Sequence, residues 1–185
     1  MAVPVPPWSS LSGPEKQART LAVADELFAR DGTDVPMPAL ADALGIGVGS
    51  IYRQVGTKDE LIATLVIDRS SILRERFLAT LDEDDPWAAM TLATHQTVDD
   101  CRGDALSQTA WNEAAFASEA VRAARIGATE ALRLMVERAR AAGHVRDDAS
   151  HEDLRLVFCA VRELGGIGPR AAHRLAELVL RGMRR

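Results

Sequence analysis

The stretch that decides the fold is residues 37–55, MPALADALGIGVGSIYRQV. Leu40, Ala41 and Leu44 lie at helical spacing and predict a short helix over residues 38–44, which Gly45 ends. After a turn of about three residues, the pattern predicts a second short helix over residues 48–55. Two short helices joined by a glycine-containing turn are the ingredients of a helix-turn-helix.

The second short helix separates an apolar face from a polar one. Ile51 and Val55 share the apolar face. The other positions carry polar side chains: Ser50, Tyr52, Arg53 and Gln54. Val48, Gly49 and Ser50 are small enough for the helix N-terminus to enter the major groove of DNA, where its free N–H groups face phosphate.

Three longer side chains complete the expected DNA interface. Arg53 has the length to reach guanine, Tyr52 has a hydroxyl for the DNA backbone, and Lys58 opens the following helix as a phosphate anchor. The alternative is that Tyr52 and Arg53 are ordinary surface residues of a structural three-helix unit. The surrounding motif favours DNA contact.

Residues 19–61 resemble the DNA-binding domain of the tetracycline-repressor (TetR) family. The resemblance rests on five short matches: Leu27-Phe28-Ala29 before Asp31-Gly32, Leu40-Ala41, Gly45, Gly49-Ser50-Ile51-Tyr52-Arg53, and Thr57-Lys58-Asp59-Glu60-Leu61. It implies a ligand-responsive transcriptional regulator, expected to be a repressor, that binds a palindromic operator as a homodimer. The residues at DNA-contacting positions of the family are Val48, Gly49, Ser50, Tyr52, Arg53, Gln54 and Lys58.

The chain departs from the family pattern at several positions. Met37 followed by Pro38 replaces the usual Thr or Ser cap, Gly47 replaces a capping Ser, and Val55 replaces an aromatic residue. A base-reading arginine found in the first short helix of some members is missing here. We therefore expect base readout to depend on Arg53, Gln54 and DNA shape.

The net charge is unusual for a nucleic-acid partner. The whole chain carries a net charge of −5, and its first sixty residues hold five basic against eight acidic side chains. A broad basic surface is therefore not expected, and non-specific affinity for DNA should be modest.

Helical periodicity continues to the end of the chain, so the predicted fold class is all-α. Capping boxes at Ser12 and Thr57 begin two longer helices, and an acidic run closes the second at residues 82–85. Further helices are predicted over these ranges: 86–101, 104–116, 118–142, 151–164 and 169 onward. The predicted organisation is a disordered arm (1–12), a three-helix DNA-binding domain (13–60) and a larger effector-binding and dimerisation domain (61–185).

The segment 141–148 and the helix after it are similar to the regulatory domains of the same family. The similarity implies a homodimer through the last two helices, packed as a four-helix bundle, and a pocket for an unknown small-molecule effector. Candidate pocket residues combine aromatic or apolar bulk with a few polar groups: Trp87, Met90, His95, Gln108, Trp111, Asn112, Phe116 and Phe158. Each of these has an alternative as an ordinary core residue.

Other functions find little support in the residues. Cys101 and Cys159 lack metal-ligand or redox spacing, and the four histidines lack the i, i+4 spacing of a helical metal pair. We expect no catalytic site, metal or cofactor, no targeting or membrane-spanning segment, and a cytoplasmic location. A small helical enzyme and a helical protein-interaction module stay open as alternatives, and a DNA-binding assay separates both from a regulator.

Overall fold

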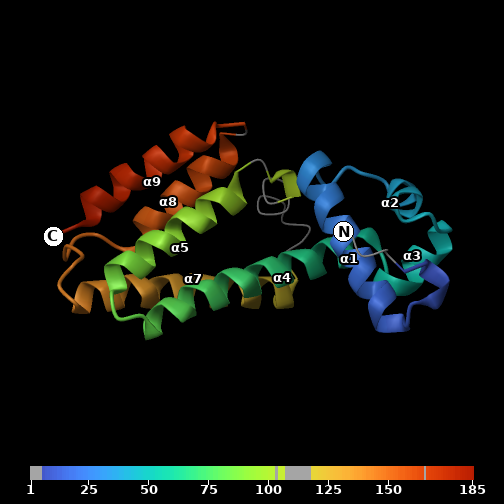
Figure 1. The fold of residues 1–185 in the computed structure, drawn as a ribbon, viewed down its shortest axis with the longest axis horizontal. Coiled ribbons are helices and arrows are strands. Elements are labelled where there is room, and N and C mark those ends of the chain that lie inside the picture. Colours follow the sequence, from blue (N-terminus) through green and yellow to red (C-terminus); the bar gives the residue numbers. More distant parts are fainter. Residues whose placement is uncertain (1–5, 103, 107–117, 165) are drawn as a thin grey trace.

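The computed structural model describes residues 6–102, 104–106, 118–164 and 166–185. Their regular structure is helical, apart from one isolated β-bridge between Val145 and Arg184. Two helical units lie end to end along the long axis, and α4 runs from one into the other (Figure 1). The predicted all-α fold is confirmed. Of the helix predicted over 104–116, residues 107–116 lie outside the described part of the chain.

The N-terminal unit consists of α1 (Gly13–Asp31), α2 (Met37–Leu44) and α3 (Val48–Val55), packed on the first part of α4. Its core is apolar. Its largest fully buried members come from the four helices and from the segment after α5: Phe28, Leu40, Ile51, Leu61, Ile62 and Leu106. The predicted bounds of α2 and α3 agree with the structure to within one residue. Amphipathic periodicity therefore located these helices correctly.

Gly45 makes the turn between α2 and α3. Its φ of 68° lies in the left-handed region, which costs glycine little but strains other residues. The N–H of Ile46 then donates to the carbonyl oxygen of Ala41 at 3.0 Å, which closes the end of α2. The turn is short enough to hold the two helices against each other.

Helix α4 (Lys58–Ala79) belongs to both units and continues as the 3-10 helix η2 (Thr80–Asp82). Leu61, Ile62 and Leu65 lie in the N-terminal core, whereas Phe77 lies in the C-terminal core. With 22 residues, α4 spans about 33 Å. A displacement of this helix therefore reaches both cores.

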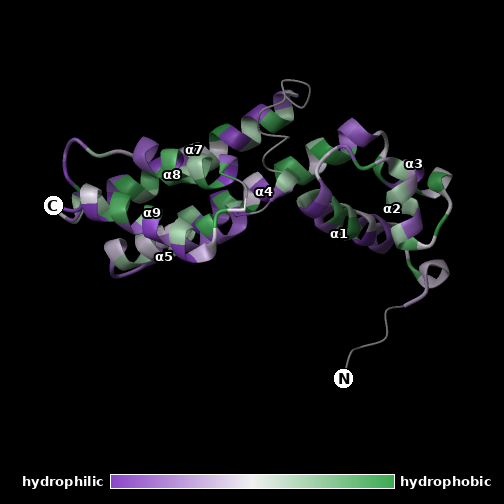
Figure 2. Ribbon diagram, turned by 90° about the horizontal axis from the view of Figure 1, so that it is seen from above, coloured by the Kyte–Doolittle hydropathy of each residue, from purple (hydrophilic) through white to green (hydrophobic). Residues whose placement is uncertain are grey.

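The C-terminal unit contains α5 (Pro86–Cys101), α7 (Glu119–Ala141), α8 (His151–Glu163) and α9 (Pro169–Met183). Helix α7 packs along α4, while α5, α8 and α9 pack on one another. Hydrophobic and hydrophilic residues alternate around these helices, as amphipathic packing requires (Figure 2). No helix within the described ranges is both long and apolar enough to cross a membrane.

The N-terminal arm differs from its prediction where it is described. Residues 8–10 form the 3-10 helix η1, and half-buried Trp8 packs against the N-terminal core. Arg19 of α1 also donates to the carbonyl oxygen of Pro6 at 2.8 Å. The prolines and serines of this arm predict disorder, but Trp8 gains free energy by burying apolar area against the core.

Candidate nucleic-acid interface and ligand cavity

Helix α3 has the two faces predicted for it. Ile51 is fully buried in the N-terminal core, and Val55 is half-buried against it. On the outer side, Val48 is 40% exposed and Tyr52 is 49% exposed, although both have large apolar groups. The outer face of this eight-residue helix therefore leaves apolar area in solvent.

The N-terminus of α3 is open to an approaching anion. The N-cap residue is Gly47, and no described side chain caps the helix. One turn along, the guanidinium of Arg53 donates to the hydroxyl of Ser50 at 3.0 Å, so Arg53 is held beside the start of the helix. Uncapped N–H groups and a nearby guanidinium form a surface that suits phosphate and guanine.

Lys58 is the first residue of α4 and follows directly on the capping box that begins this helix. The Glu60 carboxylate accepts from the Thr57 N–H at 2.7 Å and from the Thr57 hydroxyl at 2.9 Å. These hydrogen bonds hold the pKa of Glu60 below its ordinary value. Gly56, with φ at 70°, lets the chain turn here, because a Cβ would collide with the Glu60 carboxylate. The backbone at half-buried Lys58 is therefore held in a defined position next to the end of α3.

Several acidic residues of the N-terminal unit are compensated locally. Asp31 pairs with Arg30 at 2.6 Å, and Asp25 pairs with Arg69 at 2.8 Å. Because Arg69 lies in α4, a charge count over the first sixty residues does not include it. These pairs compensate the two carboxylates locally, but they do not change the net charge of the unit, because Asp68 of the same helix offsets Arg69.

Arg69 also links the two units. Its guanidinium bonds to Asp25 of α1 and, through a second nitrogen, to Asp104 in the segment after α5. Burial works to lower the pKa of Arg69, but the hydrogen bonds with Asp104 and Asp25 raise it overall, so the guanidinium stays charged. This ion-pair set ties α1 to the segment after α5 through α4.

Phe158 is the one candidate effector residue that the described structure places on the wall of a small, partly open cavity. It stacks on Phe77 with ring centroids 6.4 Å apart, beside a cavity of about 80 Å³ between α4, α5, α7 and α8. The other described residues of the wall come from these four helices: Leu73, Thr97, Cys101, Ala128, Thr129, Leu132, Arg155, Cys159 and Arg162. No carboxylate is among them.

The other described candidates lie elsewhere. Met90 is fully buried in the core, and Trp87 packs on the core with the Arg184 guanidinium 5.1 Å from its ring centroid. His95 faces His173 of α9. The remaining candidates fall outside the described residues: Gln108, Trp111, Asn112 and Phe116. The structure thus does not bring Trp87, Met90 or His95 together with Phe158.

The sequence pattern did not predict the polar residues of the cavity wall. Thr97, Thr129 and Arg162 come from three different helices, so no local pattern connects them. Cys101 also lines the wall, and burial raises the pKa of its thiol to about 11. A thiol that stays protonated at neutral pH is a weak nucleophile.

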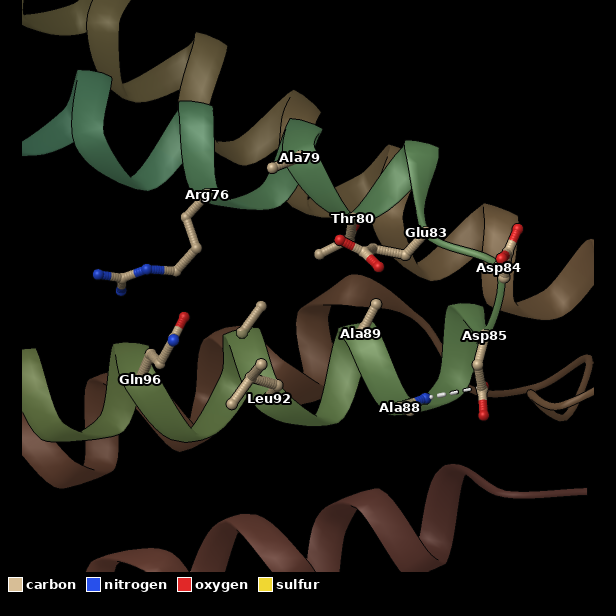
Figure 3. A pocket seen from close by; sticks show the side chains of 11 residues that line it. Arg76, Ala79, Thr80, Glu83, Asp84, Asp85, Ala88, Ala89, Leu92 and Gln96 are labelled. Carbon is tan, nitrogen blue, oxygen red and sulfur yellow. Dashed lines mark hydrogen bonds between the residues drawn. The ribbon is translucent and has the colours of Figure 1, made fainter.

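A larger open groove of about 530 Å³ runs between the end of α4 and α5 (Figure 3). Alanines and Leu92 form its apolar part, with Arg76 and Gln96 toward one end and Asp84 and Asp85 toward the other. Both ends already make structural contacts. Arg76 pairs with Asp100 at 2.6 Å, and Asp85 accepts from two N–H groups at the start of α5.

Two family models match the chain over consecutive regions. Residues 21–65 match the model described as bacterial regulatory proteins, tetR family. Residues 86–185, more than half of the chain, match the model of the C-terminal domain of SbtR-like transcriptional regulators. No curated protein sequence matches.

Solved structures share the fold along nearly the whole chain. A TetR transcription regulatory protein from Mycobacterium vanbaalenii is 23% identical with a TM-score of 0.69, over 94% of this chain and 97% of that one. The TetR regulator SCO0520 from Streptomyces coelicolor is 24% identical with a TM-score of 0.68, over 91% and 98%. A superantigen, pfit, also matches, with 21% identity and a TM-score of 0.64 over 96% and 94%. The fold by itself therefore does not decide the function.

Proposed function

The chain belongs to the TetR family of bacterial regulatory proteins, and from this premise we propose that it is a homodimeric transcriptional repressor which a small-molecule effector releases from its operator. The observation that carries the proposal is the outer face of α3. There, exposed Tyr52 and Arg53 lie beside an uncapped helix N-terminus. A binding protein of this kind has no catalytic role.

DNA contact is assigned to the predicted set of Val48, Gly49, Ser50, Tyr52, Arg53, Gln54 and Lys58. Val48, Gly49 and Ser50 allow close approach of the helix to the groove, Arg53 reads guanine, and Lys58 binds phosphate. In a symmetric dimer, the two α3 helices insert into successive major grooves about 34–36 Å apart, which requires a palindromic operator.

Dimerisation is assigned to α8 and α9. The two helices pack on each other and expose Leu156 (68%) and Leu178 (52%), while Leu164 (57%) is exposed just after the end of α8. Exposed large apolar side chains gain free energy when a second copy covers them. Two such helix pairs form the expected four-helix bundle.

The effector is assigned to the cavity beside Phe158. Its wall offers aromatic rings for an apolar body and the Thr97 and Thr129 hydroxyls for orientation. A volume of about 80 Å³ is small for a ligand, so the proposal requires the cavity to expand on binding. Gln108, Trp111, Asn112 and Phe116 remain proposed as further wall residues.

The cavity lies where ligand binding would affect α4. Leu73 and Phe77 of α4 form part of its wall, and Arg69, one turn before Leu73, holds α1 through Asp25. Expansion of the cavity would displace α4, and this displacement would change the position of α3 in each half of the dimer. The spacing of the two reading helices would then no longer fit the operator.

DNA binding tests the proposal directly. We expect the purified protein to bind DNA from upstream of its own or the adjoining gene selectively and with strong salt dependence. Arg53→Ala and Tyr52→Ala should each abolish this binding, whereas Arg30→Ala, which removes an exposed cation paired with Asp31, should not. Absence of sequence-selective binding by the folded wild type would overturn the proposal and favour a helical interaction module.

Effector response needs a second experiment. A screen of small molecules by thermal shift should find ligands that stabilise the protein by about 2.7 kcal/mol at one hundred times their dissociation constant. The same ligands should release the operator. If ligands that bind leave DNA affinity unchanged, the protein is a constitutive regulator.

A further inference from the structure

Two histidines from different helices face each other on the surface of the C-terminal unit. The Nδ1 atoms of His95 in α5 and His173 in α9 lie 2.7 Å apart, with ring centroids at 4.9 Å. Asp99, one turn after His95 on α5, has its Oδ1 2.9 Å from the Nε2 of His173. The side chain of His173 is 31% exposed and that of Asp99 is 53% exposed. Solvent therefore reaches this cluster.

The hydrogen bonds determine where the protons lie. An ionised carboxylate only accepts, so Nε2 of His173 carries the proton that Asp99 binds. Neutral His173 therefore has a bare Nδ1. Two N–H groups cannot point at each other at 2.7 Å, so His95 donates its Nδ1 proton to this lone pair. His173 is thus held in the tautomer whose Nδ1 carries no proton and directs its lone pair at His95.

We propose that His95 and His173 bind a divalent transition-metal ion of the zinc class, with Asp99 as the positioning residue. When the metal binds, His95 transfers its Nδ1 proton to solvent and takes one up on Nε2, so both rings stay neutral and both Nδ1 lone pairs face one point. Imidazole nitrogen is a good ligand for zinc, copper and nickel ions. A carboxylate on the far nitrogen is the usual partner of a metal-binding histidine, because it orients the ring and raises its basicity.

The geometry needs only a small adjustment. Zinc–nitrogen bonds of about 2.0–2.1 Å in a tetrahedral site place two nitrogens about 3.3 Å apart, so the Nδ1 atoms must separate by about 0.6 Å. Within the described ranges, no group of three or more His, Cys, Asp or Glu side chains converges as a metal site. The site therefore has two protein ligands, and water fills the remaining positions.

The site is separate from the proposed DNA and effector sites. None of His95, Asp99 and His173 is among the described residues that line the cavity beside Phe158. A bound ion would join α5 of the core to α9, so it would stabilise the packing of these two helices. The inference does not rest on the proposed function and can be tested without DNA.

Zinc titration of the protein without a histidine tag gives the first test. At ten times the dissociation constant, zinc should raise Tm by about 3–6 °C. His95→Ala and His173→Ala should each remove this shift, whereas His144→Ala, at a histidine outside the cluster, should retain it. Asp99→Asn should weaken zinc binding by about 10–100-fold without abolishing it.

Long-range ¹H–¹⁵N correlation spectra of the histidine rings provide a test that needs no variant. Zinc should shift the Nδ1 signals of two histidines and move the proton of one of them from Nδ1 to Nε2. The proposal is overturned if zinc leaves these signals unchanged, or if folded His95→Gln and His173→Gln variants both keep the wild-type zinc affinity.

Discussion

Helices α3 and α9 are both amphipathic, but they expose different kinds of side chain. Around its buried Ile51, α3 exposes small and polar residues together with the Tyr52 ring. Around its buried alanines, α9 exposes Leu178, and neighbouring α8 exposes Leu156. Both helices leave apolar groups in solvent and neither has a side-chain cap at its N-terminus. However, α9 begins with Pro169, which has no backbone N–H, whereas α3 holds the Arg53 guanidinium beside its first turn.

Two exposed surfaces of one protein can therefore suit binding partners of different chemistry. DNA is recognised by hydrogen bonds and charge in the major groove, so the role proposed for α3 requires small residues and a few well-placed donors. A second protein copy is recognised by burial of apolar area, so α8 and α9 need leucines. Variants that exchange or remove these features test the assignment of each surface.

The largest effect should follow from charges placed on the leucine surface. In the double variant Leu156→Glu with Leu178→Glu, burial of two carboxylates should dissociate the dimer. Because linked half-sites contribute about 10²–10⁴-fold to affinity, operator binding should fall by at least about 100-fold. Sedimentation velocity and DNA titration measure both effects. Ile126→Glu, at a 68% exposed residue of α7, is the matched control and should stay dimeric.

Substitutions on the two faces of α3 should affect different properties, stability on the buried face and DNA binding on the exposed face. Ile51→Ala leaves a cavity in the N-terminal core and should lower the free energy of unfolding by about 2–5 kcal/mol. Tyr52→Ala, one residue further, should change it by less than about 0.5 kcal/mol while removing DNA binding. Urea unfolding followed by circular dichroism compares them. Equal destabilisation by both variants would mean that Tyr52 is a structural residue.

Loss of the cap of α4 should have a smaller effect. Thr57→Ala removes the hydroxyl that bonds the Glu60 carboxylate and N–H, and should lower the free energy of unfolding by about 1 kcal/mol. Thr64→Ala is the control, because that hydroxyl only bonds back to the carbonyl oxygen of Glu60 within the helix. A larger loss at Thr64 than at Thr57 would contradict the assigned cap.

The same cap predicts a pH dependence. The pKa of Glu60 is lowered in the folded protein by its hydrogen bonds with Thr57, so its carboxylate contributes stability above about pH 4.5, the ordinary value. This contribution should fade as the pH falls through the lowered pKa. Thermal unfolding at pH 7 should therefore show the wild type more stable than Glu60→Gln, and the difference should shrink below about pH 4.5. If the difference in stability between the wild type and Glu60→Gln did not change with pH, the lowered pKa of Glu60 would not be its cause.

The smallest effect concerns Lys58. Lys58→Ala should weaken binding to all DNA sequences alike. It should also reduce the slope of log affinity against log salt concentration by about one unit, because one phosphate contact is lost. Arg133→Ala in α7, which removes an exposed cation paired with Glu130 in the other unit, should leave the slope unchanged. A changed sequence preference in Lys58→Ala would instead indicate a base contact.

Local features were predicted well. The bounds of α3, the end of α2 at Gly45 and the capping box of Thr57 and Glu60 agree with the structure, because each depends on residues only a few positions apart. The family match confirmed the class of protein that these residues indicate. The DNA-contacting residues themselves remain a prediction, although the structure exposes Tyr52 and Arg53 as the proposal requires.

The arrangement of the C-terminal unit needed the tertiary structure. Trp87, Met90 and His95 share α5 with cavity residues but lie in other surroundings, since helix rotation and packing decide which side chains face a cavity. Arg69 meets Asp25 across 44 residues of sequence, and His95 meets His173 across 78.

The sequence alone therefore determined α3, the turn at Gly45 before it and the cap at Thr57 after it, because hydrogen bonds and periodicity within one or two helical turns specify them. Only the tertiary structure decided the cavity beside Phe158, the link through Arg69 and the histidine pair. Those contacts join side chains from separate helices, and the rotation and packing of each helix against the others, which no local pattern encodes, bring them together.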